Sequence, residues 1–187
     1  MSSAYPSKRI FDLAVAGAAC VAIAPVLVGL SAAIWLEDKR PSLFRQSRVG
    51  QDRKPFTILK FRSMHEHQVT RVGEWLRQTG IDELPQFINV CRGDMSIVGP
   101  RPLTQHDIER LGWNDAGHDW RFAAKPGITG LSQLLAGRGS RASERLDRLY
   151  LKRQSPLLDA QLIALSFAVN VLGKRRIRRW LRSVPAA

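Results

Sequence analysis

Two adjacent carboxylates, Asp82 and Glu83, are the side chains in this sequence whose types and spacing best suit chemistry. They precede Pro85, which a helix accepts only in its first turn, so a helix is predicted to begin around residues 82–84 and to end near Gly93. At a helix N-terminus the free amides and the macrodipole favour anions, both a carboxylate and an incoming phosphate. This position is expected to keep Asp82 ionised.

Cationic side chains elsewhere in the sequence suit phosphate binding. Arg101 lies between two prolines that stiffen its backbone, so its guanidinium is pre-positioned for two-point binding of phosphate. Lys60 and Arg62 share one face of a predicted strand over residues 56–62, because side chains along a strand alternate. Taken alone, these two motifs are more often an exposed turn and a solvated strand edge.

The elements that must position these residues read as a mixture of short strands and helices. A hairpin is predicted with its turn at residues 50–53, followed by a helix over residues 69–78 that places Val72, Trp75 and Leu76 on one side. Further predicted elements are a strand at 96–98, a rigid turn at 125–130, a flexible basic loop at 137–140, and helices at 142–152 and 157–172. The fold class is therefore α/β, mainly α.

Composition narrows the partners of the chain. The 187 residues include 29 basic and 16 acidic side chains, a net charge of +13, which indicates nucleic acid, an anionic membrane surface or phosphorylated substrates. A hydrophobic fraction of 44% excludes a disordered basic tail protein. The two cysteines, Cys20 and Cys91, exclude a disulfide-rich secreted scaffold and favour a reducing compartment. The four histidines lack the spacing of a metal site.

An apolar segment without charged residues runs from Leu13 to Leu36. As a straight helix it would be about 36 Å long, enough to cross a bilayer core of about 30 Å. Pro25 lies near its middle and is expected to kink or break the helix. The residues alone leave two alternatives open: a re-entrant helix-break-helix hairpin, or one kinked transmembrane helix. The hairpin is favoured by basic residues at both ends, namely Lys8, Arg9, Lys39 and Arg40.

The C-terminal residues 174–182 combine basic side chains with Trp180, a pattern typical of a segment that rests on anionic lipid. A nucleic-acid arm is the less favoured interpretation. The predicted organisation is an N-terminal apolar membrane segment with basic flanks at 1–40, a polar body at 41–172, and a basic tail at 173–187.

Considered together and in order, these motifs resemble the bacterial sugar transferases of the monotopic polyprenyl-phosphate phosphoglycosyl transferase type. The resemblance runs from about residue 8 to residue 167, and the length is similar to that of short members with only the catalytic domain. One such motif would be weak, but many in the same order are specific. The matching stretches are KRIFD at 8–12, FRQSRVG at 44–50, KFRSM at 60–64, TRVG at 70–73, DELPQ at 82–86, NV at 89–90, GDMSIVGPRP at 93–102, PGITG at 126–130 and LLD at 157–159.

The resemblance implies a re-entrant membrane helix shaped by Pro25 and a small α/β domain with amphipathic interfacial helices, attached to the cytoplasmic face of the bacterial inner membrane. It implies transfer of a phosphosugar from a nucleotide diphosphate sugar, usually a UDP-sugar, to a polyprenyl phosphate such as undecaprenyl phosphate, at the start of polysaccharide or glycoconjugate synthesis. It also implies a requirement for Mg²⁺. Membrane lipids are expected partners, nucleic acid is not, and a homo-oligomer is left open.

The resemblance also implies roles for individual residues. Asp82 would attack the phosphorus next to the sugar and form an aspartyl-phosphosugar intermediate, and Glu83 would bind the magnesium ion. The expected phosphate-binding and substrate-binding residues are Arg77, Arg101, Lys60, Arg62 and Gln133.

Two stretches depart from the family pattern. Ala24 replaces the usual serine before the helix-breaking proline, and Leu131-Ser132 replaces the usual tryptophan and alanine before Gln133, so the sugar cannot be inferred by analogy. The alternative from another class is a non-catalytic, membrane-tethered basic adaptor that binds anionic lipid or nucleic acid, for which Asp82 and Glu83 would have no use.

Overall fold

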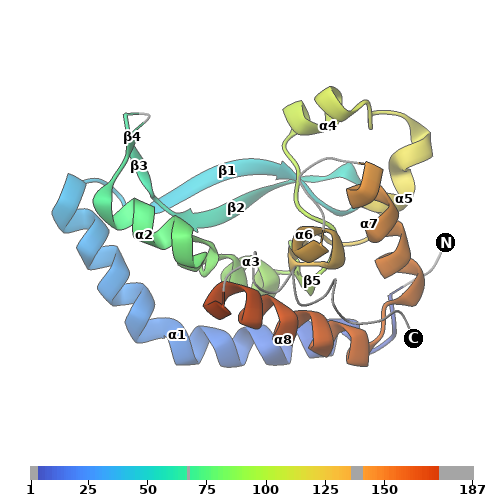
Figure 1. The fold of residues 1–187 in the computed structure, drawn as a ribbon, viewed down its shortest axis with the longest axis horizontal. Helices are drawn as coiled ribbons and strands as arrows, with labels where there is room; N and C mark the ends of the chain where they lie inside the picture. The colour runs from blue at the N-terminus through green and yellow to red at the C-terminus, as the bar shows by residue number, and fades with distance from the viewer. Residues whose placement is uncertain (1–3, 67, 136–140, 173–187) are drawn as a thin grey trace.

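The long helix α1, Lys8–Asp38, lies along the underside of the molecule in a computed structural model that describes residues 4–66, 68–135 and 141–172 (Figure 1). Its side chains are largely uncovered, with Val21 78% and Val28 70% exposed. Within the described residues it is the one helix long and apolar enough to cross a membrane, with a mean hydropathy of 2.4. Such an apolar, uncovered surface in water is unfavourable, which indicates membrane association.

Pro25 lies inside α1 and does not end it. The expected break into two helices is therefore not observed, and the helix is continuous from Lys8 to Asp38 while its axis changes direction (Figure 1). A proline removes one backbone donor and clashes with the preceding turn, so it bends a helix that its other hydrogen bonds maintain. At the C-terminal end Lys39 adopts a left-handed conformation, and its ammonium lies 4.3 Å from the centroid of the Trp35 ring.

The predicted hairpin is confirmed as an antiparallel pair in which Phe44 lies opposite Lys60. Its two strands are β1, Leu43–Val49, and β2, Pro55–Phe61, joined through the 3-10 turn η1, Gln51–Arg53. Phe61 is buried with Ile34 and Leu76, so this small cluster joins β2 to α1 and α2. A second pair, β3, Met64–His65, and β4, Gln68–Val69, follows directly.

The helix predicted over residues 69–78 is α2, Arg71–Thr79, which Thr70 caps through its side chain. Leu76 is fully buried and Val72 packs against the same cluster, whereas Trp75 is 49% exposed. The helix rests against the chain at Ser63, whose carbonyl oxygen lies 2.1 Å from where a Cβ of Gly73 would be. The close approach requires glycine at this position.

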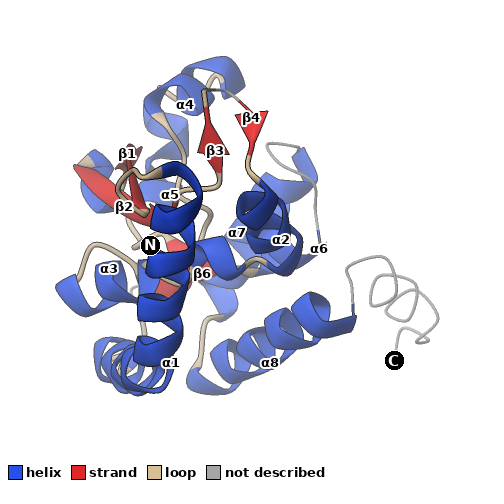
Figure 2. Cartoon of the chain, turned by 90° about the vertical axis from the view of Figure 1, so that its left-hand side faces the viewer, coloured by secondary structure: helices blue, strands red, loops and turns tan. Residues whose placement is uncertain are grey.

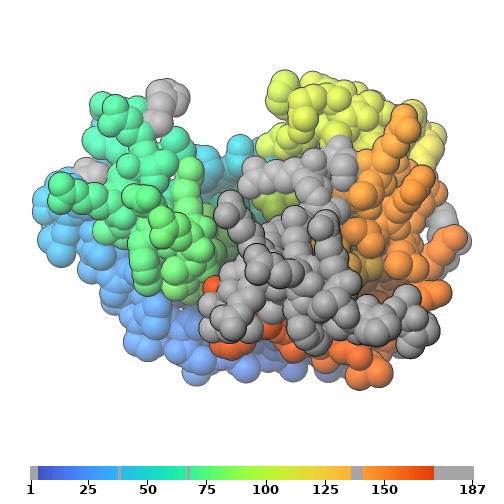
Figure 3. Space-filling view, viewed as in Figure 1, coloured from blue at the N-terminus to red at the C-terminus, as the bar shows by residue number. Residues whose placement is uncertain are grey.

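The rest of the domain packs around a short parallel pair, β5, Ser96–Val98, and β6, Gly127–Thr129. Gly127 approaches Gly99 so closely that a Cβ on Gly127 would lie 2.1 Å from the Gly99 nitrogen. Helices cover this pair on several sides (Figure 2), and in the space-filling view the surface is hollowed between α2 and α4 (Figure 3). The remaining elements are α3, Gln86–Arg92; α4, Gln105–Leu111; η3, Ala116–His118; α5, Asp119–Phe122; α6, Leu131–Leu135; α7, Arg141–Arg153; and α8, Pro156–Leu172. The molecule is mostly helical with small sheets, as predicted; the basic loop at 137–140 and the tail at 174–182 lie outside the described residues.

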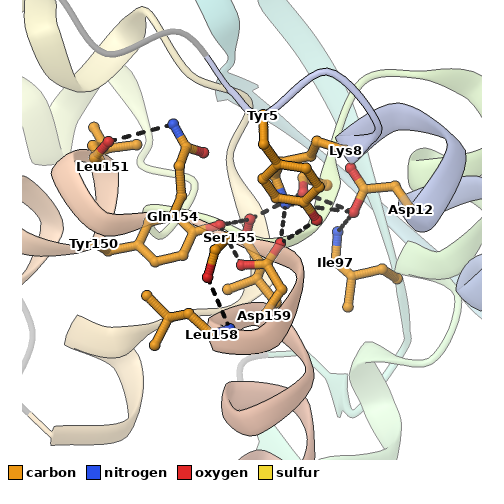
Figure 4. Close-up of polar contacts among 12 residues, drawn as sticks. Tyr5, Lys8, Asp12, Ile97, Tyr150, Leu151, Gln154, Ser155, Leu158 and Asp159 are labelled. Carbon is orange, nitrogen blue, oxygen red and sulfur yellow. Dashed lines mark hydrogen bonds and ion pairs between the residues drawn. The ribbon is translucent and has the colours of Figure 1, made fainter.

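A buried carboxylate, Asp159, ties the start of α1 to α7 and α8 (Figure 4). It accepts hydrogen bonds from Lys8 at 2.7 Å, from the Tyr150 hydroxyl at 2.8 Å and from the Tyr5 hydroxyl at 3.0 Å. A second buried carboxylate, Asp12, accepts from the Ser96 hydroxyl and from the Ile97 amide, both at 3.0 Å. Because a buried charge is costly without partners, these contacts fix the first turns of α1 firmly to the domain.

Candidate active site

The acidic pair lies in a single 3-10 turn, η2, Ile81–Glu83, between two helices. The left-handed Gly80 ends α2 immediately before the turn, and α3 begins only at Gln86, after Pro85. The expected helix start at residues 82–84 is therefore too early, whereas its end at Gly93 is confirmed. The physical reason is that residues 81–84 close tight 3-10 hydrogen bonds, such as Leu84 N to Ile81 O at 3.1 Å, before the α-helical pattern begins.

A cavity of about 530 Å³ opens beside this turn. We call it the acidic-pair cavity; its charged and polar lining includes Arg77, Glu83, Arg101 and Gln133, and its apolar lining includes Phe87 and Phe167. The lining residues come from α2, η2, α3, α6, α8 and the segment after β5, so segments far apart in the sequence meet here. An apolar cavity with a few convergent polar groups is the usual form of a small-molecule site.

Lys60 pairs directly with the acidic turn. Its ammonium lies 2.6 Å from Glu83 Oε1, and both residues line a small cleft with Gln86, Arg101 and Gln133 that continues from the acidic-pair cavity. The strand β2 thus presents one of its two predicted cations to the acidic pair. A charge-assisted contact of this length holds both side chains in defined positions.

Two more predicted residues are held by neighbouring backbone and side-chain groups. Arg77, in the last turn of α2, donates from Nε to the Ser63 hydroxyl at 2.8 Å, which orients its guanidinium at the edge of the cavity. Gln133 donates to the carbonyl oxygen of Gly127 at 3.2 Å, so its amide also braces the β5–β6 pair. Glycines near Gln133 let the backbone segments approach, since a Cβ at Gly130 would lie 2.2 Å from the Gly99 carbonyl oxygen.

The pKa of Asp82 is raised above its ordinary value. Burial of the carboxyl is the largest cause, and the charge of Glu83 adds to it, while Lys60 and Arg77 act in the opposite direction. The expectation that a helix N-terminus keeps Asp82 ionised is thus not supported, because α3 begins beyond the acidic pair. A neighbouring pair of carboxyl groups with one raised pKa is a common feature of functional sites.

Comparisons with known proteins agree with this geometry. The family model described as "Bacterial sugar transferase" matches residues 3–173, almost the whole chain. This chain belongs to the bacterial sugar transferase family. The predicted family is confirmed.

Named relatives of this sugar transferase carry related descriptions. A UDP-glucose:undecaprenyl-phosphate glucose-1-phosphate transferase of Caulobacter vibrioides is 42% identical over 75% of this chain and 58% of its own length. A protein of the same description from Klebsiella pneumoniae is 37% identical over 89% of this chain and 40% of its own length. A UDP-N-acetylgalactosamine-undecaprenyl-phosphate N-acetylgalactosaminephosphotransferase of Aeromonas hydrophila is 34% identical over 83% of this chain and 41% of its own length. The chain therefore spans only about half the length of these relatives.

The structure brings six of the seven predicted site residues of the sugar transferase together and leaves one apart. Glu83, Arg77, Arg101 and Gln133 line the acidic-pair cavity, Asp82 adjoins Glu83, and Lys60 pairs with Glu83. Arg62, which directly follows β2, lines neither this cavity nor the adjoining cleft.

Gln86 is a residue of the site to which the sequence assigned no role. Its side chain is 2% exposed, it lines the small cleft with Lys60 and Glu83, and its Nε2 has no hydrogen-bond partner among the described residues. A buried amide donor without a partner costs free energy, so it suits a ligand acceptor such as a phosphate oxygen. Its place three residues after Glu83, in the same DELPQ motif, was the available signal.

The carboxylates of the site suit a magnesium ion that is bound jointly by the protein and by substrate phosphates. Among the described residues no group of three or more His, Cys, Asp or Glu side chains converges, so this part of the protein offers no complete metal cage. Asp82 and Glu83 are adjacent carboxylates beside cations suited to phosphate. Magnesium is commonly held by one or two carboxylates together with substrate phosphates, which is the arrangement this pair could complete.

Proposed function

We propose that this sugar transferase transfers a phosphosugar from a nucleotide diphosphate sugar, a UDP-sugar, to undecaprenyl phosphate. The observation that carries the proposal is the acidic pair beside a cavity in which Arg77 and Arg101 provide positive charge. The printed descriptions of the relatives, which name UDP-sugars and undecaprenyl phosphate, support the same assignment. A small apolar cavity with a few charges suits a nucleotide sugar, and its exposed Phe167 suits an approaching lipid.

In the proposed mechanism Asp82 acts as the nucleophile. Its carboxylate oxygen attacks the phosphorus next to the sugar, a P–O bond to the nucleoside monophosphate breaks, and the chain carries an aspartyl-phosphosugar. An oxygen of undecaprenyl phosphate then attacks the same phosphorus, and Asp82 leaves as a carboxylate. Division into two displacements means that the two anionic substrates do not have to meet each other directly.

The other residues act by position and charge. Arg77 and Arg101 face the donor phosphates, Gln133 contacts the donor, and Lys60 holds Glu83 in place. Glu83 with Asp82 would hold Mg²⁺, which when bound neutralises charge on phosphate oxygens. Since burial and Glu83 raise the pKa of Asp82, positive charge near the pair favours the ionised nucleophile.

We further propose that α1 is a re-entrant membrane element. Its start is bound to the domain through Asp12 and through Arg9, which donates to the Val90 carbonyl oxygen at 2.6 Å. Near its end, Glu37 accepts from the Arg71 amide at 2.9 Å. Both ends are therefore held by one polar domain, and a domain with this much charge does not cross a bilayer. The domain would face the cytoplasm, where the nucleotide sugar is available.

A membrane-tethered adaptor without catalysis fits the site less well. An adaptor for anions gains nothing from two adjacent, partly buried carboxylates, because negative charges beside an anion site weaken anion binding.

The decisive experiment is a transfer assay on the purified chain. We expect continuous UMP release from at least one UDP-sugar in the presence of undecaprenyl phosphate and Mg²⁺. Without the lipid, release should stop at about one UMP per chain, because the aspartyl-phosphosugar cannot turn over, and without the metal no UMP should be released. Absence of release from a panel of UDP-sugars, with an active family member measured in parallel, would contradict the proposal.

The topology has its own experiment. Ala4→Cys and Arg40→Cys, each in a Cys20→Ser and Cys91→Ser background, place single thiols beside the two ends of α1. An impermeant maleimide added to spheroplasts should label neither variant, and permeabilised cells should show labelling of both. Labelling of one end only from outside would establish a transmembrane helix instead.

A further inference from the structure

A second cavity, of about 590 Å³, lies at the first turn of α1 and shares no lining residue with the acidic-pair cavity. We call it the basic cavity; it is lined by Tyr5, Lys8, Arg9, Lys125, Arg148 and Lys152, among others. Ser96 and Val98 line this cavity, whereas Ile97 lines the acidic-pair cavity. Because side chains of a strand alternate, β5 separates the two cavities.

The charges that line the basic cavity do not balance. Five cationic side chains face one carboxylate, Asp12, whose oxygen is already bonded to Ser96 and Ile97. Of the cations, Lys8 pairs with the buried Asp159, Arg9 donates to backbone carbonyls of α3, and Arg148 pairs with Glu144 at 3.2 Å. Lys125 and Lys152 have no hydrogen bond or salt bridge to any residue that the structure describes. Two cations thus remain for a ligand.

Lys125 is held where its charge is unfavourable. Its ammonium and the Arg9 guanidinium converge on Gly93, lying 3.7 Å and 3.6 Å from where a Cβ of that glycine would be. Burial, and then the charge of Arg9, lower the pKa of Lys125, while the carboxylates Asp12 and Asp94 act against this. A bound anion would reverse the effect, since it favours the charged ammonium.

The remaining lining indicates where the anion comes from. Aromatic side chains of Tyr5, Trp120 and Tyr150 surround the cations, and the Arg148 guanidinium lies 4.2 Å from the Trp120 ring centroid. The cavity opens where the uncovered apolar helix α1 begins, with Ile10 already 71% exposed. Aromatic and cationic side chains at the head of an apolar helix occupy the headgroup level of a membrane.

We propose that the basic cavity binds the phosphate of an anionic membrane phospholipid, such as phosphatidylglycerol, with Lys125 and Lys152 as its ligands. The site rests on the membrane association of α1 in the proposed function, and it is distinct from the site of the reaction. Its role is to hold the head of α1 at the membrane surface by a specific lipid rather than by diffuse attraction alone.

The test uses the purified full chain in a neutral detergent, with native mass spectrometry to count bound lipid. The probes are dihexanoyl phosphatidylglycerol, dihexanoyl phosphatidylcholine and glycerol phosphate. We expect one phosphatidylglycerol per chain and at least tenfold weaker binding in the Lys125→Gln, Lys152→Gln double variant. The matched control is Arg45→Gln, Lys54→Gln, which removes the same charge from exposed positions that line neither cavity and should change binding less than twofold.

Each other outcome contradicts the proposal. Equal binding to the double variant and the control variant would show diffuse attraction only, and equal binding of phosphatidylcholine would show that the phosphate charge is not recognised. Glycerol phosphate bound as tightly as the lipid would show a soluble ligand. If the double variant does not fold, the single variant Lys152→Gln, at an exposed position, should still weaken binding severalfold.

This experiment is independent of the transfer assay. Specific binding of phosphatidylglycerol without UMP release would leave the lipid site in place and refute the proposed function. UMP release with unchanged lipid binding in the double variant would support the proposed function and refute the lipid site. The double variant should keep its transfer activity in phosphatidylcholine micelles, since neither lysine lines the acidic-pair cavity.

Discussion

The acidic-pair cavity and the basic cavity are similar in size and lie on opposite sides of β5, but their charges are arranged for different tasks. In the first, cations such as Arg77 and Arg101 stand opposite two carboxylates. In the second, cations exceed the single carboxylate of Asp12, which is itself fully bonded. Positive charge alone suffices to bind phosphate, whereas phosphoryl transfer also needs a nucleophile and a metal ligand.

The comparison also divides the net charge of +13 into separate roles. Lys60 is committed to Glu83 and Lys8 to Asp159, so these two cations are neutralised within the protein. Lys125 and Lys152 form no salt bridge with any residue that the structure describes, and both line the basic cavity. A count of basic residues in the sequence does not distinguish these two kinds.

The largest expected effect is a change at the acidic pair that abolishes transfer activity but leaves lipid binding in the basic cavity intact. Asp82→Asn removes the nucleophile and should reduce UMP release by about a thousandfold or more, since neutral amides do not form the covalent intermediate. Binding of phosphatidylglycerol should be unchanged. The control Asp52→Asn alters an exposed aspartate whose left-handed backbone asparagine also tolerates. Comparable activity of Asp82→Asn and the control would remove Asp82 from the mechanism.

The next effect concerns the anchor of the basic cavity. Asp159→Asn leaves Lys8 without its buried partner, so we expect a loss of about 3 kcal/mol in the free energy of unfolding, measured by thermal or denaturant unfolding. Adding Lys8→Met should recover part of this loss, because it removes the unpaired charge. Additive losses in the double variant would show that the two residues are not coupled.

A smaller effect concerns pH and stability at the acidic pair. A raised carboxyl pKa in the folded state adds stability below the ordinary aspartate pKa of about 3.9, and that stability is lost as pH rises through the folded-state value. In magnesium-free buffer at pH 7, Asp82→Asn should therefore raise the free energy of unfolding, and the gain should shrink towards pH 4. Because Asp82 is only partly buried and solvent screens its charge, we expect the gain to stay below about 1 kcal/mol. Thermal unfolding across this pH range measures it.

Asp107 provides a control, because its pKa is shifted in the direction opposite to that of Asp82. Burial alone would raise its pKa, but hydrogen bonds from Thr104 outweigh burial and lower it. Asp107→Asn should therefore lower stability at pH 7, with the loss shrinking as pH falls. A loss for both variants at pH 7 would mean that the carboxyl pair at residues 82 and 83 is not under electrostatic strain.

The smallest expected effect concerns the contact between α1 and α3. The thiols of Cys20 and Cys91 are in hydrogen-bonding contact, so mild oxidation with copper phenanthroline should form a crosslink within the chain. Transfer activity should change less than twofold, because the crosslink joins helices that already pack together. Non-reducing electrophoresis and mass spectrometry would detect it, and Cys20→Ser is the control. No crosslink would place α1 away from α3.

Local motifs predicted most of the fold, whereas contacts between residues far apart in the sequence could not be predicted from it. The hairpin and the end of α3 at Gly93 followed from alternation and from glycine, which act over a few residues. The close approach of Gly73 to Ser63 did not follow, because it is a tertiary contact. Among the site residues, Asp82 and Glu83 stood out as adjacent carboxylates, but the roles predicted for them came from the family resemblance.

The contact of Lys60 with Glu83 and the unpartnered amide of Gln86 depend on how β2 meets η2. The basic cavity could not be predicted from the sequence for the same reason, since Lys8 lies more than a hundred residues before Lys125 and Lys152.

The strand β5, which separates the two cavities, also depends on the order in which the chain is synthesised. The strand β5 pairs with β6, and its Ile97 amide donates a hydrogen bond to Asp12 near the start of the chain. Its Val98 carbonyl oxygen accepts a hydrogen bond from the Tyr150 hydroxyl at 3.0 Å. During synthesis β5 thus remains incomplete until Tyr150 has emerged from the ribosome, long after α1 has been translated. The apolar helix α1 is therefore available to the membrane before β5 has gained all of its partners.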